Sequence, residues 1–555
     1  MKKPFLILFL VGFLLYLPSL FGPFLWDDED FVYANKYVEN FQIDKFFTDS
    51  QTAGRGKLSN YYRPVPQIIY ASIHSITGFN PFWYHLVNIL AHIGTAGAIF
   101  YFFYTLLEQT DSNETGRQQD KKFLESNMSV FAHAANRDLE STRTSRMSPK
   151  NYFGLQSLPF LAALIFLIHP VQTEAVSYIS GLSDPLFVVF GFLSLIYFLK
   201  NRFLPSALFF LLSLLSKETG IVFLGLLLAL ELIKQKYNDR YQIVWSIFQT
   251  IKNSWGHIVI AMLYLWYHLT HINQLDMVSL WGNNIYSHSL TVRILTFVQS
   301  LYSYIGLLLF PKDLFMERDY STHIQTNIFN PYLLGFILVN LLVIFAIWKL
   351  KHSLEIKNWK LKIAVFCFLG FFISFAPYSG IVLINGLFYE HFLYLPSVFF
   401  FAFWLILFQK FLGNKNVVIA IFLFLILLAG RNIIRQFDWT DAIRFYSQTL
   451  AHAPNSIRIQ NGLAMAYADR GENDLAIRQY NNTISLNPNV PNLYHNLANV
   501  YAAMGEVKLA EENYLKAIDV DPKFLFSWQS LANLYEQTGQ KEKLANLIER
   551  YKMLK

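Results

Sequence analysis

The chain has 555 residues, of which 54% are hydrophobic, 17% aromatic and only 15% charged. Soluble domains carry about 25% charged residues, so this composition excludes an ordinary soluble protein and indicates a chain built mostly for lipid. The net charge is +7, but the basic residues collect in short clusters between apolar segments, which favours a membrane-topology signal over a nucleic-acid-binding patch. The single cysteine, Cys367, excludes intrachain disulfides. The sequence therefore predicts a bilayer as the main environment and no nucleic-acid partner.

Twelve apolar segments are long enough, or nearly long enough, to cross a bilayer. They are 4–22, 81–107, 155–169, 184–199, 203–216, 219–234, 256–271, 291–311, 329–349, 361–377, 391–410 and 416–435. The first lacks a small-residue cleavage site, and we expect it to be a retained helix rather than a signal peptide. Residues 108–153 form a polar insert without apolar periodicity and are predicted to be a flexible loop.

Clusters of lysine and arginine indicate which loops face the cytoplasm. Lys2 and Lys3 place the N-terminus inside, and the basic loops 200–202, 234–240 and 349–362 should also lie inside. These assignments require an odd number of crossings, so one of the twelve segments does not cross. The candidate is 291–311, which is interrupted by polar and glycine residues, and this leaves about eleven spans.

The composition changes after residue 437, where three segments align at a spacing of 34 residues. The aligned residues are Leu463, Leu497 and Leu531; Ala464, Ala498 and Ala532; Tyr467, Tyr501 and Tyr535; and Gly471, Gly505 and Gly539. This is the pattern of the tetratricopeptide repeat, a stacked helix-turn-helix unit. We predict an all-α chain with a membrane helical bundle at 1–437 and a solenoid of about 3.5 repeats at 438–555.

With this topology, ionisable residues collect at the outer ends of the apolar segments. An acidic stretch, "WDDED", follows the first segment and contains Asp27, Asp28, Glu29 and Asp30. The other members are Arg63, His169, Glu174, Asp184, Lys217, Glu218, Glu317, Arg318, Asp319, Glu390 and His391. Each alone could be a charge that reaches the interface from a helix end. Their convergence on one face instead predicts a cavity with carboxylates and cations that opens outward.

The same pieces resemble the transmembrane and tetratricopeptide-repeat O-mannosyltransferases and, more broadly, the multi-pass C-type glycosyltransferases. The matching stretches are "WDDEDFVYAN", "YYRPV", "FLIHPVQTEAVSYISGLSD", "LLSKETG", "LFPKDLFMERDYS", "YEHFLYLPS" and the repeats. The resemblance covers most of the chain apart from 108–153. Two positions differ from the family's pattern: Leu182 stands where arginine is usual, and His391 replaces the arginine that usually follows Glu390.

The resemblance implies an enzyme that transfers a sugar, mannose or another hexose, from a polyprenyl-phosphate donor to Ser or Thr of an exported protein. Asp27 or Asp28 would be the catalytic base of an inverting displacement. Arg63, Lys217 and, more weakly, Arg318 or His391 are the candidate cations for the leaving phosphate, and His169, Glu174, Asp184, Glu218 and Glu390 would also line the substrate site. The repeats would recruit the acceptor outside, in the periplasm of a bacterial inner-membrane protein or the lumen of the endoplasmic reticulum.

Two alternatives stay open from the sequence. "DED" could hold a divalent metal through Asp28 and Asp30, although the resemblance favours a mechanism without metal or other cofactor. The chain could also be a non-catalytic scaffold that docks partners through its repeats, or an enzyme of the same fold that modifies a glycan or a lipid.

Overall fold

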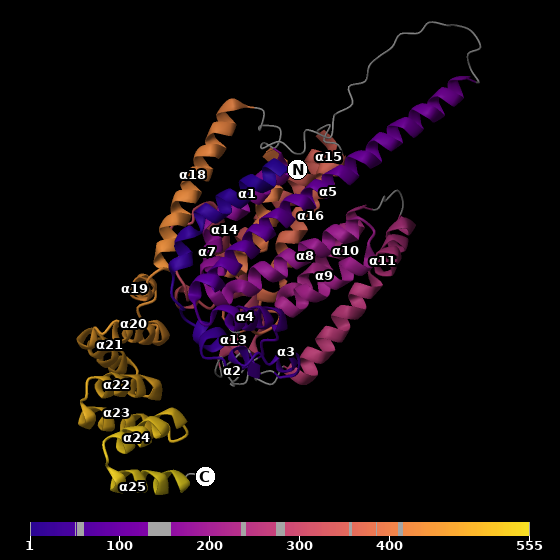
Figure 1. Ribbon diagram of the computed structural model, residues 1–555. Helices are drawn as coiled ribbons and strands as arrows, with labels where there is room; N and C mark the ends of the chain where they lie inside the picture. Colours follow the sequence, from indigo (N-terminus) through magenta and orange to yellow (C-terminus); the bar gives the residue numbers. More distant parts are fainter. Residues whose placement is uncertain are drawn as a thin grey trace. The chain divides into compact units, whose positions relative to one another are not determined.

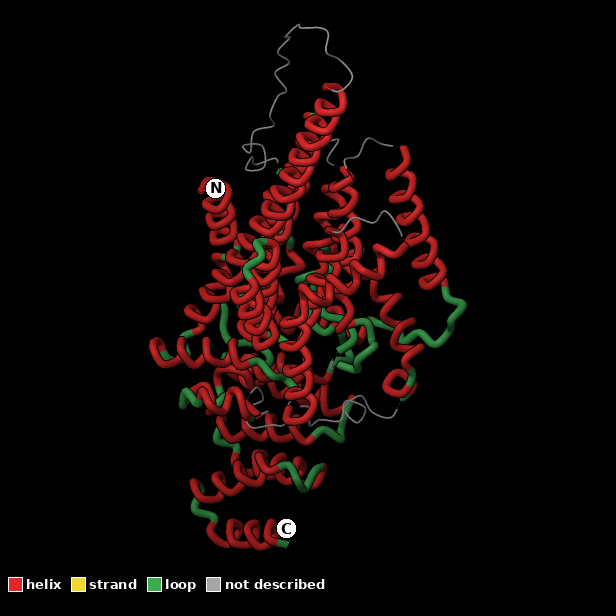
Figure 2. Tube along the Cα trace, turned by 90° about the vertical axis from the view of Figure 1, so that its right-hand side faces the viewer, coloured by secondary structure: helices red, strands yellow, loops and turns green. Residues whose placement is uncertain are grey.

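The computed structural model describes residues 2–49, 51–52, 60–130, 157–234, 240–272, 284–353, 358–384, 386–408 and 414–553. Within these ranges the chain consists of helices and loops, without a β-strand (Figure 2). It divides into two compact units. The first comprises Met1–Leu314 and Thr322–Phe437, and the second comprises Phe315–Ser321 and Asp438–Lys555.

The first unit is a bundle of apolar helices (Figure 1). Its main helices are α1 (Lys2–Leu15), α4 (Pro64–Thr77), α5 (Pro81–Val130), α6 (Leu158–Ile168), α8 (Ser183–Leu199), α9 (Phe203–Ser216), α10 (Val222–Lys234), α11 (Arg240–Tyr267), α14 (Leu290–Leu309), α15 (Pro331–Ser353), α16 (Asn358–Phe375), α17 (Pro396–Phe408) and α18 (Lys415–Asp438). Short helices α2 (Lys36–Glu39), α3 (Ile43–Thr48), α7 (Thr173–Ser177) and α13 (Ile285–His288) lie in the connections. Figure 1 shows the N-terminus and the start of α18 at one end of this unit and α4 at the other.

The described helices support a multi-pass membrane protein but not the predicted count of about eleven spans. Five are long and apolar enough to cross a membrane, or six if the bent pair Leu158–Ile168 and Pro170–Ser177 counts as one span. Several others fall short of the roughly 20 residues that a crossing needs; α6 has 11 residues, α17 has 13 and α9 has 14. The number of crossings stays a prediction.

Helix α14 falls in the segment predicted not to cross, although its length and composition would allow a span. Near its start, Arg293 Nε donates to the carbonyl of Gly380, which follows α16, at 2.7 Å. Near its end, the carbonyl of Leu308 lies 3.1 Å from Nε2 of His169, which follows α6. The two ends of α14 therefore contact the segments that follow α6 and α16. Whether α14 crosses the membrane stays a prediction.

The insert contains a difference from the sequence-based prediction. Helix α5 does not end near residue 107 but continues to Val130, so the first half of the segment predicted as a loop is helical. The sequence "EQTDSNETGRQQDKKFLESN" is rich in Glu, Gln, Lys and Arg, which favour helices, and it has no proline to stop one. Residues 131–156 lie outside the described part of the chain.

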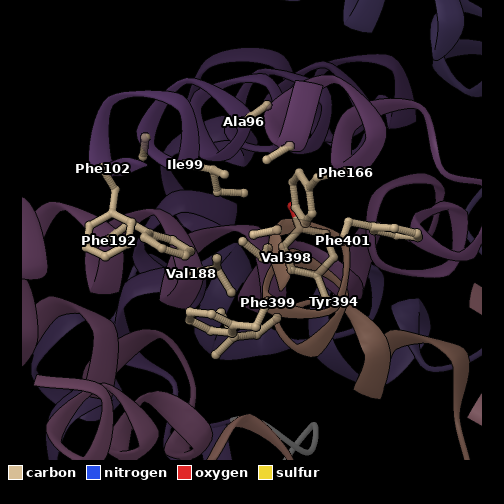
Figure 3. Packing of buried hydrophobic residues seen from close by; sticks show 14 of the residues in the cluster. Ala96, Ile99, Phe102, Phe166, Val188, Phe192, Tyr394, Val398, Phe399 and Phe401 are labelled. Carbon is tan, nitrogen blue, oxygen red and sulfur yellow. The ribbon is translucent and has the colours of Figure 1, made fainter. Parts of the chain in front are cut away.

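Aromatic and branched side chains fill the centre of the bundle (Figure 3). Phe102 of α5 packs against Phe192 of α8 at a ring distance of 5.3 Å, and Phe192 packs against Phe399 of α17 at 6.2 Å. All three side chains are buried. Helices α5, α8 and α17 therefore share one core, and this core holds the three helices in fixed positions relative to one another.

The second unit confirms the predicted repeats. Three helix pairs, α20 (Ile457–Asp469) with α21 (Asn473–Leu486), α22 (Pro491–Ala503) with α23 (Val507–Val520), and α24 (Leu525–Gln537) with α25 (Lys541–Lys552), follow α19 (Ala442–His452). The aligned Gly471, Gly505 and Gly539 have φ values of 78°, 78° and 71°, a conformation that other residues rarely adopt. The equivalent leucines are buried, as the repeat pattern requires.

Candidate functional site

The acidic stretch is anchored to the bundle by Asp28. Its Oδ2 accepts a hydrogen bond from the backbone of Leu25 at 2.9 Å, and its Oδ1 accepts from the backbone and hydroxyl of Ser180 at 2.7 and 2.6 Å. The side chain is 1% exposed, and burial raises the pKa of Asp28 to about 7 against the opposite effect of these hydrogen bonds. Asp27 is partly exposed, and its backbone N–H donates to the hydroxyl of Tyr178 at 3.1 Å. The two aspartates therefore have different environments.

The turn Ile179–Leu182 holds the partner of Asp28 in place. The hydroxyl of Tyr70 in α4 donates to the carbonyl of Ile179 at 2.9 Å, and Nδ2 of Asn88 in α5 donates to the same carbonyl at 3.1 Å. Gly181 is needed in this turn because a Cβ there would lie 2.8 Å from the carbonyl oxygen of Ala175. Helices α4 and α5 thus position the acidic stretch through the turn.

Two cations of the site are each paired with a carboxylate from another part of the chain. Lys217 Nζ lies 2.7 Å from Asp184 Oδ1, and both side chains are buried. Arg63 Nε lies 3.3 Å from Glu218 Oε2, and Glu218 also accepts from the backbone of Tyr62 at 2.6 Å. Lys217 is therefore not limited to a local contact with its neighbour Glu218. Position 217 is joined to α8 instead.

These pairs belong to one electrostatic cluster. Burial lowers the pKa of Lys217, and the positive charge of Arg63 adds to this, while Asp184 acts in the opposite direction. Burial alone would raise the pKa of Glu218, but Arg63 and backbone hydrogen bonds lower it. His391 lies within electrostatic range of Lys217, Asp184 and Arg63. The sequence-predicted residues at these positions are therefore brought together.

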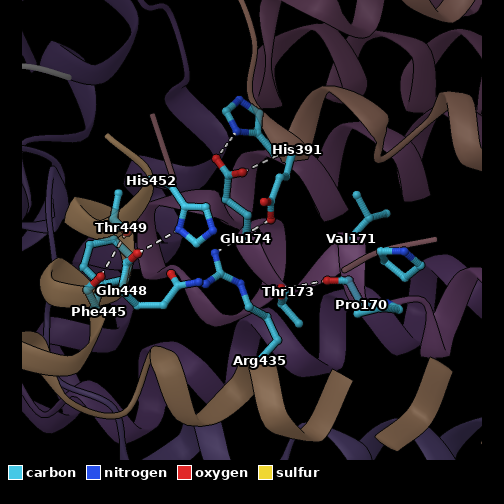
Figure 4. A network of polar contacts seen from close by, with 12 residues as sticks. Pro170, Val171, Thr173, Glu174, His391, Arg435, Phe445, Gln448, Thr449 and His452 are labelled. Atoms are coloured by element: carbon cyan, nitrogen blue, oxygen red, sulfur yellow. Dashed lines mark hydrogen bonds and ion pairs between the residues drawn. The ribbon is translucent and has the colours of Figure 1, made fainter. Parts of the chain in front are cut away.

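A second set of polar contacts joins α7 and α18 to the segment before α17 (Figure 4). His391 Nδ1 lies 2.6 Å from Glu174 Oε1, and the His391 backbone donates to Glu174 Oε2 at 3.2 Å. Next to them, Arg435 NH2 lies 3.8 Å from Glu390 Oε2, and both side chains have no exposed area. His391 is therefore part of this network rather than an isolated charge at a helix end.

Two of the predicted residues have other described contacts. His169 follows α6, where its Nδ1 accepts from the backbone of Val171 at 3.2 Å and its Nε2 lies 3.1 Å from the carbonyl of Leu308 in α14. Arg318 belongs to the second unit, where its guanidinium stacks on Phe315 at 4.2 Å. In the same segment, Glu317 accepts a hydrogen bond from Ser456 of the repeats.

The position of Leu182 explains how the chain accommodates one departure from the family pattern. Leu182 is fully buried among the apolar residues that surround the acidic stretch, including Val32 and Val38. An arginine there would bury a charge in an apolar cluster, which is costly without a partner. The structure thus uses this position for packing.

Four residues of the network were not identified as site residues from the sequence: Ser180, Tyr70, Asn88 and Arg435. The first three are uncharged polar residues whose partners lie up to 152 positions away. In the sequence, Arg435 is a basic residue at the end of the last apolar segment. Among the described residues, no group of three or more His, Cys, Asp or Glu side chains is arranged to hold a metal ion.

The fold and the cluster define a multi-pass membrane protein with a polar site at one end of its helical bundle and a tetratricopeptide-repeat unit. Family models of the repeat match residues 464–505 ("TPR repeat") and 491–524 ("Tetratricopeptide repeat"). The chain is 24% identical over 474 residues to "Protein O-mannosyl-transferase F38B6.6" of Caenorhabditis elegans, covering 84% of this chain and 60% of that protein. It is 26% identical over 234 residues to the human "Protein O-mannosyl-transferase TMTC2", covering 39% of this chain and 22% of that protein. The mouse protein of the same name is 25% identical over 275 residues, covering 46% and 27%.

These matches confirm the resemblance to tetratricopeptide-repeat O-mannosyltransferases. The chain spans less than two thirds of the length of the relatives it matches.

Proposed function

We propose that this protein is a membrane glycosyltransferase that transfers a hexose, mannose by analogy with its relatives, from a polyprenyl phosphate to Ser or Thr of an exported protein. The observation that carries the proposal is the cluster of two aspartates and two cation–carboxylate pairs at one end of the helical bundle. The aspartates come from the loop after α1, and the pairs come from the residue before α4, from α8 and from the turn after α9. A lipid phosphate would present its sugar at this depth, because the lipid tail holds the phosphate at the membrane surface.

In this proposal, Asp27 is the base and Asp28 is a positioning residue. Both oxygens of Asp28 accept hydrogen bonds from Leu25 and Ser180, whereas Asp27 is a partly exposed residue. The acceptor hydroxyl gives its proton to Asp27 as its oxygen bonds to the anomeric carbon. The bond from that carbon to the phosphate oxygen breaks on the opposite side, and its electron pair leaves with the phosphate, so the configuration inverts.

Lys217 and Arg63 are the proposed cations for the departing phosphate. Their carboxylate partners hold each cation in a defined position before the donor arrives, and Asp184 opposes the tendency of the buried Lys217 to lose its proton. We expect no metal to be needed, because these two cations can stabilise the charge that develops on the phosphate.

The proposed location is a bacterial inner membrane or the endoplasmic reticulum, with the cluster and the repeats on the periplasmic or lumenal side. The N-terminus with Lys2 and Lys3 and the start of α18 with Lys415 lie at the end of the bundle away from α4 (Figure 1). The positive-inside rule would put that end in the cytoplasm. The repeats would recruit the protein acceptor, since stacked helical repeats provide extended binding surfaces.

The second candidate is a non-catalytic scaffold of the same fold. The observations that favour it are the pairing of both cations with carboxylates and the replacement of two arginines of the family by Leu182 and His391. A scaffold would bind partners through its repeats without turnover, and would tolerate the loss of Asp27.

The test is sugar transfer by the full-length protein in lipid nanodiscs, from a polyprenyl-phosphate mannose to a Ser/Thr peptide, followed by mass spectrometry. Wild type should add a hexose, and Asp27→Asn should lose this activity. Equal transfer by both proteins would overturn the assignment of the base, and absence of transfer by wild type from any hexose donor would favour the scaffold.

A further inference from the structure

The first helices of the three repeats differ from the second helices in charge. Helices α20, α22 and α24 contain only three charged residues, and α22 contains none. Helices α21, α23 and α25 contain thirteen. Charges of the second helices pair with one another, as in Lys543 with Glu511 at 2.7 Å and Arg550 with Asp519 at 2.8 Å. The surface made by the first helices is therefore close to neutral.

Side-chain amides take the place of charges on the first helices. Six exposed or partly exposed amides form what we call the amide face: Asn461, Asn492, Asn496, Asn499, Gln529 and Asn533. Those of α22 and of α24 are spaced by three or four residues within their helix, which places them on one side, and α20 contributes Asn461.

Contacts between helices join these residues into one surface. Helix α20 contacts α22, and α22 contacts α24. Asn496 Nδ2 donates to Asn461 Oδ1 at 3.0 Å, and His495 Nδ1 lies 3.0 Å from the hydroxyl of Ser527 in the next repeat. The amide face is thus continuous across the three repeats.

We propose that the amide face binds an extended, uncharged segment of the acceptor protein, rich in Ser and Thr, through that segment's backbone. This inference rests on the proposed function, which makes a protein hydroxyl the acceptor. Each side-chain amide offers a C=O acceptor and N–H donors, the same groups as a peptide bond. A helical partner would use its own backbone groups internally, so the partner must be extended.

Spacing and charge agree with this partner. Packed helices lie about 9 Å apart, which corresponds to about three residues of an extended chain at roughly 3.3 Å each. A segment of about nine residues would therefore reach all three first helices. Arg458 of α20, at the repeat position equivalent to Asn492, is already paired with Glu317 at 3.8 Å. A charged side chain of the partner would therefore lose water on this face and would have to compete for that pair, which is unfavourable. The face consequently selects against charged segments.

The test measures binding of end-blocked fluorescent peptides of about twelve residues to the full-length protein in nanodiscs, without sugar donor. One peptide contains only Ser, Thr, Ala and Gly, and two others carry three Glu or three Lys in place of Ala. The neutral peptide should bind at least about tenfold more tightly than the Glu peptide. Equal affinity for all three would overturn the proposal.

The matched variants are Asn492→Asp with Asn533→Asp on the amide face, and Asn481→Asp with Asn482→Asp on α21 as the control. All four residues are exposed. The first double variant should bind the neutral peptide about tenfold more weakly and gain affinity for the Lys peptide, while the control should bind as wild type does. Unchanged binding by the first double variant would refute the role of the amide face. Because no donor is present, a protein without transferase activity could still pass this test, so the two proposals fail separately.

Discussion

The different environments of Asp27 and Asp28 predict different consequences for the same substitution. Asp27→Asn keeps the size and the backbone hydrogen bond to Tyr178 but removes the proposed proton acceptor. General-base catalysis contributes about 10²–10⁴-fold, so the rate of transfer should fall by that factor while donor affinity and stability stay close to those of wild type.

Asp28→Asn should act on stability first. The carboxylate accepts from Leu25 on one oxygen and from Ser180 on the other, and an amide can accept on only one of these sides. The amide N–H₂ would then face a backbone N–H, leaving a buried donor without its partner, which costs about 1–3 kcal/mol. The apparent melting temperature should fall. Since the acidic stretch would also lose its anchor, the rate of transfer should decrease as well.

The raised pKa of Asp28 gives this prediction a pH signature. Between an ordinary carboxyl pKa of about 3.9 and the folded value of about 7, the folded state holds a proton that the unfolded state releases. The contribution of Asp28 to stability is therefore largest below pH 4 and is lost as the pH rises through 7. The difference in melting temperature between wild type and Asp28→Asn should therefore be largest below pH 4 and should decrease as the pH rises through 7.

Single-turnover transfer with labelled donor and thermal denaturation of the same nanodisc samples would measure both effects. Glu29→Gln is the control, because Glu29 is an exposed acid of the same stretch. Full transfer by Asp27→Asn would refute the reasoning. A loss of transfer in Asp28→Asn without a change in stability would make Asp28 the base, and transfer by wild type should then rise with pH around 7.

Three further predictions concern the donor, the topology and the repeats. Lys217→Met should weaken donor binding and also destabilise the protein, because it leaves Asp184 buried without its cation. The double variant Lys217→Met with Asp184→Asn should regain stability but not donor affinity. Recovery of both stability and donor affinity would show that Lys217 is a structural residue. Protease added to intact spheroplasts, or to sealed lumen-side-out vesicles, should remove the segment after residue 440, and its protection would contradict the proposed topology. Deletion of 456–555 should abolish modification of natural acceptors but spare slow transfer to a short peptide. Complete loss of peptide transfer in a folded truncation would contradict the prediction that the repeats recruit the acceptor and take no part in the chemistry.

The repeats could be predicted from the sequence because their determinants are local and periodic. A leucine, an alanine and a glycine at fixed offsets define each helix pair, and the positive φ of Gly471 is a property of that turn alone. Helix α5 shows the limit of the same approach, because a polar composition was interpreted as a loop where helix-favouring residues continue the helix.

The members of the site could largely be predicted, but not their partners. Ionisable residues in apolar surroundings stand out in a sequence, which identified Asp184, Lys217, Glu218 and Arg63 individually. Which acid pairs with which base depends on how distant helices pack, and Arg63 lies 155 positions from Glu218. Lys217 and Glu218 are adjacent in the sequence, yet each is bonded to another element.

The network around Glu174 shows how the chain retains its structure where it departs from the family pattern. An arginine after Glu390 would always be charged, whereas a histidine with an ordinary pKa of about 6.5 is mostly neutral at pH 7. His391 nevertheless reaches the buried Glu174 with both its ring and its backbone N–H, so the hydrogen bonds of that carboxylate do not depend on the missing charge. Arg435 supplies a guanidinium from α18 to Glu390, next to the same segment. The segment before α17 is therefore held by polar contacts on two sides. What the substitution removes is a fixed positive charge near Lys217 and Arg63, and in the proposed reaction these two cations must stabilise the leaving phosphate without its help.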